Sequence, residues 1–140
     1  MNAISLKRTA AAALTAALVL GAAGCATTGS AGKFKGEAHG VAQTIADLQT
    51  DATASDEQKV CERDLASTVV ARLNSAGSSC ARAIDSQLSQ IDSFNLTVES
   101  VKVSGASATA SVKGTRAGKN RIEQLQLVKE GKRWKISSLG

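Results

Sequence analysis

The sequence contains few of the residues on which catalytic and nucleic-acid sites usually depend. Its 140 residues include one His, one Trp, two Phe and neither Tyr nor Pro. Proteins that bind single-stranded nucleic acid stack bases on aromatic rings. We therefore expect no nucleic-acid partner despite the formal net charge of +5.

The remaining composition is that of a small folded protein. Hydrophobic residues, chiefly Ala, Val, Leu and Ile, make up 43% of the chain. A length of 140 residues allows one domain, because two domains would each bury too little apolar surface. With no Pro and 21% charged residues, the chain lacks the composition of a disordered protein.

The first residues have the pattern of a secretory signal peptide. Lys7 and Arg8 precede an uncharged run over residues 9–32, whose apolar centre covers residues 10–20. A helix of that length would span roughly half of a bilayer core about 30 Å thick. We therefore expect residues 1–24 to be a cleaved signal peptide rather than a transmembrane helix.

The segment Ala22-Ala23-Gly24-Cys25 follows directly and resembles the lipobox of bacterial lipoproteins. The resemblance implies that Cys25 becomes the first residue of the mature chain and carries a diacylglycerol. Two or three acyl chains would hold the protein in the lipid bilayer, at the extracytoplasmic face of a cell membrane. The alternative is an ordinary secretory cleavage site in which Cys25 is incidental.

Residues 25–36 are rich in Gly, Ser and Thr and have no apolar period, so we expect a flexible tether. Lys33 and Lys35 would lie in solvent or near anionic headgroups. The glycines do not form a phosphate-binding loop, because no strand precedes them and no Gly-Lys-Ser/Thr follows. We therefore expect no cofactor.

Cys61 and Cys80 remain as a pair once Cys25 is lipidated, in an exported and therefore oxidising setting. We predict a disulfide between them, which would close a loop of about 20 residues and contribute about 3 kcal/mol by the chain-entropy model. A metal site would need more Cys or His than the chain has, and a catalytic thiol would need the distant His39 as its base.

Three amphipathic helices are predicted for residues 37–91, from apolar residues at three- and four-residue steps. The first carries Ala38, Val41, Ala42, Ile45 and Leu48. The second begins at a capping box of Ser55 and Gln58 and carries Cys61, Leu65, Val69 and Leu73. The third is capped by Ser79 and carries Cys80, Ile84, Leu88 and Ile91.

After Ser93 the apolar period changes to alternation, which predicts four antiparallel strands. A change of phase between Val98 and Val101 indicates a β-bulge at residues 99–100. Turns are expected at Gly105, at residues 114–120 and at residues 130–132. Helices followed by strands predict an α+β fold.

The same order of features, closed by Leu-Val-Lys-Glu-Gly-Lys-Arg-Trp-Lys-Ile at residues 127–136, resembles small actinobacterial lipoproteins with a nuclear transport factor two-like (cystatin-like) domain. The resemblance covers about residues 36–139. It implies a curved four-stranded sheet wrapped around helices as a cone, sometimes with a pocket, and it implies no single function. The expected organisation is a signal peptide over residues 1–24, a tether over residues 25–36 and one domain over residues 37–140.

Enzymes of that superfold generally place an Asp or Glu with a His or Tyr inside the cone. This chain has no Tyr, and His39 stands beside the tether, where we expect a solvated or capping side chain. Asp47, Asp64, Asp85 and Asp92 fall off the apolar stripes and are expected in solvent. We therefore expect no catalytic residue, and a non-enzymatic binding module; a small hydrolase or isomerase is the alternative.

Trp134 is the one candidate residue for contact with a ligand. A lone Trp in a terminal strand is more often the largest piece of an aromatic-poor core, and we expect it there. The ligand of the module is expected to be a protein partner or a small apolar molecule.

Charge is divided unevenly along the domain. Residues 37–99 contain ten acidic and four basic residues, and residues 100–140 contain two acidic and nine basic residues. We expect the strand lysines to solvate the outer sheet face and to discourage edge pairing; these are Lys102, Lys113, Lys129, Lys132 and Lys135. A basic face that meets an anionic partner is the alternative.

Overall fold

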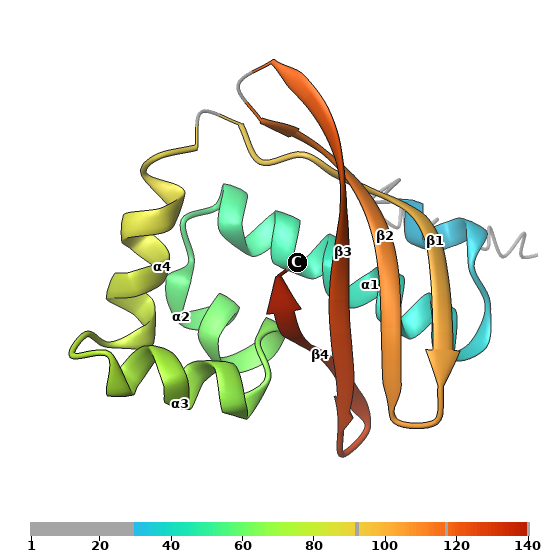
Figure 1. Cartoon of the computed structure of the whole chain (residues 1–140), viewed down its shortest axis with the longest axis horizontal. Helices are drawn as coiled ribbons and strands as arrows, with labels where there is room; N and C mark the ends of the chain where they lie inside the picture. Colours follow the sequence, from blue (N-terminus) through green and yellow to red (C-terminus); the bar gives the residue numbers. More distant parts are fainter. Residues whose placement is uncertain (1–29, 92, 117, 140) are drawn as a thin grey trace, which may run out of the picture.

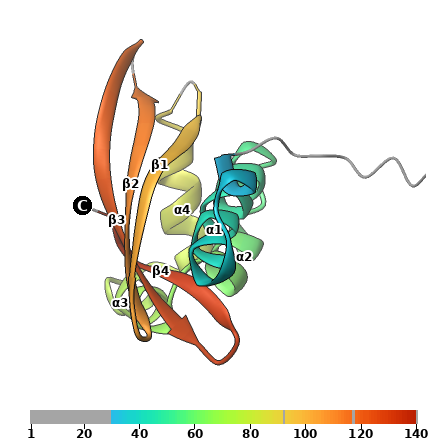
Figure 2. The same cartoon turned by 90° about the vertical axis from the view of Figure 1, so that its right-hand side faces the viewer.

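The computed structural model of the chain describes residues 30–91, 93–116 and 118–139. In this part of the chain, helices cover one face of a four-stranded antiparallel sheet (Figures 1 and 2). The helices are α1 (Gly36–Thr53), α2 (Glu57–Lys59), α3 (Ser67–Ser75) and α4 (Cys80–Leu88), with a 3-10 turn η1 (Ser30–Lys33) and a π-helical turn η2 (Val60–Asp64). The strands are β1 (Leu96–Ser104), β2 (Ser107–Arg116), β3 (Lys119–Glu130) and β4 (Arg133–Leu139). The predicted α+β class is confirmed.

The sheet is a meander in which each strand pairs with the next one along the chain. The predicted bulge is present as a register shift between Val98 and Ser100. Gly105 and Gly131 have φ of 59° and 62° in the first and last hairpin turns, a conformation that favours glycine. The turn predicted over residues 114–120 is shorter than predicted, because β2 and β3 stay paired as far as Arg116 and Lys119. A side-chain hydrogen bond from Thr115 Oγ1 to Asn120 Oδ1 at 3.1 Å adds to the ladder hydrogen bonds of this hairpin.

Helix α1 packs its apolar stripe on the inner face of the sheet. Val41, Ala42, Ile45 and Leu48 are all buried, as the spacing predicts. The inward residues of the strands complete the core; they include Val98, Ala108, Ala110, Val112, Leu125, Leu127 and Ile136. Alternation along the strands and the helical period of α1 therefore define one continuous core.

The second predicted helix is wrong, because the chain breaks inside it. α2 and η2 are followed by Leu65 in an extended conformation, which forms a parallel bridge with Ile136 of β4. The amide of Ala66 donates to the carbonyl of Ile136 at 2.8 Å. Pairing with the edge of β4 thus replaces one helical turn, while the four-residue spacing still brings Leu65 into the core.

The cap of this segment also differs from the predicted one. The carboxylate of Asp56, not the hydroxyl of Ser55, accepts from the amide of Lys59 at 3.1 Å. Ser55 instead adopts a φ of 53° in the preceding turn. The Ser79 cap of α4 is confirmed, since its side chain accepts from the amide of Arg82.

The predicted signal peptide, Cys25 and the first residues of the predicted tether lie outside the described residues. The end of the predicted tether is structured, because η1 buries Ala31 and Phe34 packs against the core. Packing of these two apolar side chains beside α1 holds this part of the chain against the domain. No helix within the described residues is long and apolar enough to cross a membrane.

Candidate functional site

Cys61 and Cys80 are joined by a disulfide, with their Cα atoms 6.1 Å apart. The bond connects η2 to the first residue of α4. Helices α3 and α4 lie wholly within the described residues, and Cys80 is their one buried residue. The remaining contacts of this helical pair with the core come from half-buried side chains, among them Val69 and Ile84. The disulfide is therefore a main attachment of α3 and α4 to the domain.

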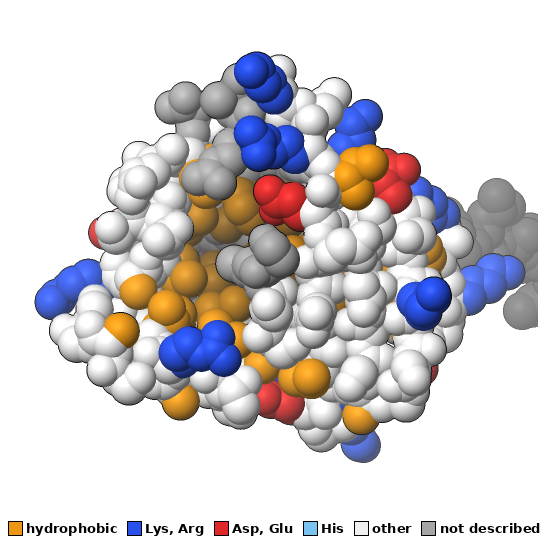
Figure 3. All heavy atoms as spheres, in the orientation of Figure 1, with side chains coloured by type: hydrophobic (Ala, Val, Ile, Leu, Met, Phe, Trp, Pro, Cys, Tyr) orange, Lys and Arg blue, Asp and Glu red, His pale blue; other side chains and the backbone are white. Residues whose placement is uncertain are grey.

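Between this helical pair and the sheet lies a cavity of about 530 Å³. Its wall is mostly apolar and is contributed by Val69, Leu73, Ile84, Phe94, Leu96 and Leu125, among others. Figure 3 shows hydrophobic side chains gathered in a hollow on this face, with charged side chains at the rim. Arg121 and Glu123, both exposed, are the charged residues that line it. The volume falls within the range of about 300 to 1,000 Å³ of small-molecule sites.

A smaller hollow of about 310 Å³ adjoins this cavity through Ala52, Leu88 and Phe94. Its wall is more polar and includes Glu57 and Asp85. Binding of an uncharged ligand depends mainly on the apolar area removed from water. The larger, apolar cavity is therefore the candidate binding site.

Trp134 lies in the core beneath α1 and is not among the residues that line either cavity. Its indole Nε1 donates to Glu37 Oε2 at 2.7 Å, and its backbone carbonyl accepts from Thr44 Oγ1 at 2.9 Å. A Cβ at Gly40 would lie 3.0 Å from the ring, so a larger residue there would require the ring to shift by a few tenths of an ångström. The predicted core position of Trp134 is confirmed.

Glu37 was not singled out by the sequence, yet it connects α1 to two strands. Lys129 Nζ lies 2.6 Å from Glu37 Oε1, and the same ammonium is 5.9 Å from the centre of the Trp134 ring. The hydrogen bonds from Lys129 and from Trp134 lower the pKa of Glu37 below its ordinary value. The three side chains form one polar contact across the outer edge of the core.

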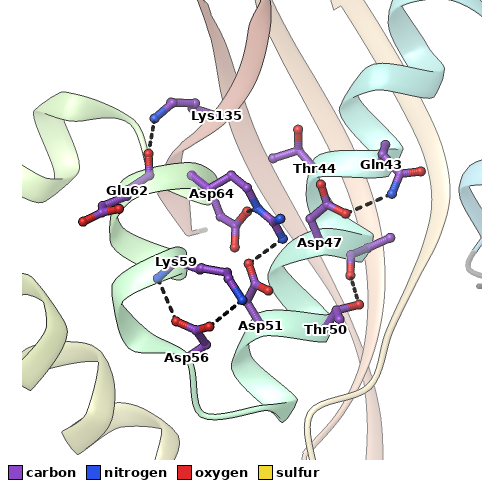
Figure 4. A network of polar contacts seen from close by, with 12 residues as sticks. Gln43, Thr44, Asp47, Thr50, Asp51, Asp56, Lys59, Glu62, Asp64 and Lys135 are labelled. Atoms are coloured by element: carbon purple, nitrogen blue, oxygen red, sulfur yellow. Dashed lines mark hydrogen bonds and ion pairs between the residues drawn. The ribbon is translucent and has the colours of Figure 1, made fainter.

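Asp64 is 1% exposed, so its predicted position in solvent is wrong. Together with Asp51, also buried, it lies between α1 and η2 (Figure 4). Arg63 Nη2 binds Asp51 at 2.6 Å, whereas its Nε is 3.4 Å from Asp64 Oδ1. Asp64 Oδ2 is buried without a hydrogen-bond partner among the described residues. Burial, followed by the charge of Asp51, raises the pKa of Asp64 to about 7.

Substitution Asp64→Asn is expected to flatten the dependence of stability on pH. The folded chain keeps the Asp64 proton up to about pH 7, whereas an unfolded chain releases it near pH 4. The contribution of this group therefore favours folding below about pH 4 and is lost as the pH rises to about 7. Between pH 5 and pH 8 the variant should gain about 1 to 3 kcal/mol of unfolding free energy relative to the unmodified chain.

Urea denaturation at the two pH values measures this difference. Asp85→Asn is the matched control, because Asp85 is exposed on α4. Parallel pH profiles for Asp64→Asn and the unmodified chain would show that Asp64 ionises normally in the folded state.

The other predicted positions divide between solvent and structural contacts. His39 is exposed, with Nδ1 3.0 Å from the carbonyl oxygen of Ala31. Asp85 is exposed and Asp47 is half-buried, where it accepts from the Gln43 amide at 3.0 Å. Asp92 lies outside the described residues. The described residues bring together no three His, Cys, Asp or Glu side chains that could hold a metal ion.

The predicted lysine-covered sheet face is correct in part. Lys102, Lys113 and Lys132 are exposed. Lys129 instead binds Glu37, and Lys135 Nζ donates to the carbonyl of Glu62 at 2.7 Å. These two lysines face the helical layer because it supplies their partners, a carboxylate for Lys129 and a backbone carbonyl for Lys135.

No family model matches the chain, and no curated protein matches it. Among solved structures, a designed nuclear transport factor two-like (NTF2-like) protein is similar over 74% of this chain and 97% of its own length. The TM-score is 0.50 and the sequence identity is 13%. The likeness supports a nuclear transport factor two-like fold, and at this identity it concerns the fold alone.

Proposed function

We propose that this nuclear transport factor two-like domain is a binding module that holds a small apolar molecule in the cavity between α3, α4 and the sheet. The main support for this proposal is the cavity itself, which has a volume of about 530 Å³, a mostly apolar wall and charged residues at its rim. An apolar ligand of matching size would bury its surface there and displace weakly bound water.

The distribution of ionisable groups favours binding over catalysis. A general acid or base must reach the bound substrate within hydrogen-bond distance. The raised-pKa carboxyl of Asp64 is held between α1 and η2 and is not among the residues that line the cavity. The charged residues that do line the cavity, Arg121 and Glu123, are both exposed. We therefore propose a binder rather than a hydrolase or isomerase.

We also propose that the domain is held at the extracytoplasmic face of a membrane by acylated Cys25. The support is the order of charged residues, apolar run and Ala22-Ala23-Gly24-Cys25 in the sequence. The disulfide fits an oxidising compartment outside the cytoplasm. The intact mass of the chain extracted from its host's membranes tests the anchor: an acylated Cys25 at the N-terminus supports it, and an unmodified Cys25 overturns it.

Filling the cavity is expected to weaken ligand binding while leaving the fold intact. Ala83 lies half-buried on α4 and lines the cavity, so Ala83→Phe places a ring inside it. Titration with the neutral dye N-phenyl-1-naphthylamine measures binding, because its fluorescence rises in apolar surroundings. We expect at least about tenfold weaker binding by the variant, equivalent to about 1.4 kcal/mol.

Ala71→Phe is the matched control, since Ala71 is exposed on the neighbouring helix and does not line the cavity. Emission from the single Trp reports whether each variant keeps its fold. Equal dye binding by both variants, or none by the unmodified chain, would contradict the proposal and favour a protein partner.

A further inference from the structure

Two opposite charges stand at the mouth of the cavity on one strand. Arg121 and Glu123 lie on β3 and, with Leu125, belong to the same face of the sheet, since alternate residues of a strand share a face. Leu125 is buried in the cavity wall, and Glu123 and Arg121 are exposed. The strand therefore leads from an apolar interior to an acidic and then a basic side chain.

Neither charge has a partner among the residues that the structure describes. Within the described residues, Arg121 and Glu123 form no ion pair and no side-chain hydrogen bond, and they do not pair with each other. By contrast, Lys129 and Glu130, farther along the same strand, both bind helix residues. The two rim charges are thus available to a ligand.

The strand beside these residues also contributes to the cavity wall. Arg121 is opposite Gly114 on β2, and Glu123 is opposite Val112. Gly114 itself lines the cavity and has no side chain to cover the guanidinium. Residues two apart on a strand are separated by about 6.5 to 7 Å, which one small headgroup with two charges can span.

From this arrangement we infer that the ligand is a single-chain amphiphile with a zwitterionic headgroup. The apolar chain occupies the cavity, the anionic group of the head binds Arg121, and its cationic group binds Glu123. A purely anionic head would be repelled by Glu123 and a purely cationic one by Arg121, and a neutral head would leave both charges partly desolvated without a partner. The inference rests on the proposed binding function of the cavity.

Four probes with the same twelve-carbon chain test it by calorimetric titration below their micelle concentrations. They are dodecylphosphocholine (zwitterionic), dodecanoate (anionic), dodecyltrimethylammonium (cationic) and dodecyl maltoside (neutral). We expect the zwitterionic probe to bind about two- to fivefold more tightly than each of the others, the size expected for solvent-exposed charge pairs.

Neutralising either Arg121 or Glu123 should change the order of affinity among the four probes. Arg121→Gln leaves Glu123 alone at the rim, so the cationic probe should become the tightest. Glu123→Gln leaves Arg121 alone, so the anionic probe should become the tightest. Lys113→Gln is the control, because Lys113 is exposed on β2 and does not line the cavity, and it should leave the order unchanged.

The possible outcomes distinguish failure of the headgroup inference from failure of the proposed binding function. A crossed preference in the two rim variants supports recognition of a zwitterion. Equal binding of all four probes by all variants overturns the headgroup inference and leaves an apolar binding site. Absence of binding by every probe to the unmodified chain overturns both the inference and the proposed function.

Discussion

Replacing Trp134 with Ala should lower the free energy of unfolding by about 3 to 5 kcal/mol, the cost of removing a large buried aromatic side chain. Trp134 is 4% exposed and lies beneath α1, where Gly40 approaches its ring. The loss would leave a void between α1 and β4 that neither rigid element can close. Because small domains have roughly 5 to 15 kcal/mol of total stability, this variant should be close to unfolding.

Urea denaturation followed by far-ultraviolet circular dichroism measures the effect without needing the Trp signal. Trp134→Phe is the informative second variant, since it keeps most of the apolar body and removes the donor to Glu37. Its cost should be nearer about 1 kcal/mol plus a small packing loss, because the side chain of Glu37 is 53% exposed and can bind water instead. A fully stable Trp134→Ala protein would place the ring outside the core.

Removing the disulfide by the paired substitution Cys61→Ser and Cys80→Ser should cost about 3 kcal/mol, since the bond closes a loop with a sequence separation of 19. The structural consequence should be concentrated in α3 and α4, whose one buried residue is Cys80. Without the bond, this helical pair should open before the sheet does. The same pair forms a wall of the cavity, so dye binding should weaken as well.

Denaturation gives the global loss, and amide hydrogen exchange locates it. We expect faster exchange across α3 and α4 and nearly unchanged exchange across β2 and β3. Dithiothreitol treatment of the unmodified chain should reproduce the effect, which controls for the introduced serines. Unchanged stability and exchange after reduction would show that packing alone holds α3 and α4.

The strands and the first helix could be predicted because each obeys one period along its whole length. Apart from the turns and two register shifts, at Val98/Ser100 and Gln126/Leu127, residues 94–136 alternate, and α1 keeps its three- and four-residue steps from Val41 to Leu48. When one face of a sheet or helix is buried, apolar residues recur in the sequence at the period of that element. The disulfide could be predicted from the count of Cys residues together with the export that the first residues of the sequence predict.

The break after η2 could not be predicted in this way. Cys61, Leu65 and Val69 keep helical spacing although Leu65 is extended and paired with β4. The competing hydrogen bond comes from Ile136, far along the chain, so no local pattern records it. The burial of Asp64 has the same origin, because it follows from the packing of η2 on α1.

The resemblance indicated that the fold sometimes has a pocket, but the residues of this cavity could not be predicted, since its wall is assembled from α1, η2, α3, α4 and three strands. None of these elements contributes a motif. The contact of Glu37 with Trp134 joins residues 97 positions apart, so no local pattern in the sequence predicts it. In the sequence, Arg121 and Glu123 have the pattern of ordinary solvent-facing charges on a strand. Only the structure shows that they lie on the face of β3 that lines the cavity.

Native mass spectrometry of the chain, taken from its own host's membranes in a detergent-free polymer disc, would show whether the cavity holds an amphiphile. We expect an oxidised, acylated chain with a bound amphiphile, and loss of that adduct in Ala83→Phe but not in Ala71→Phe. An oxidised chain that carries no small molecule in either form would contradict a ligand-binding cavity.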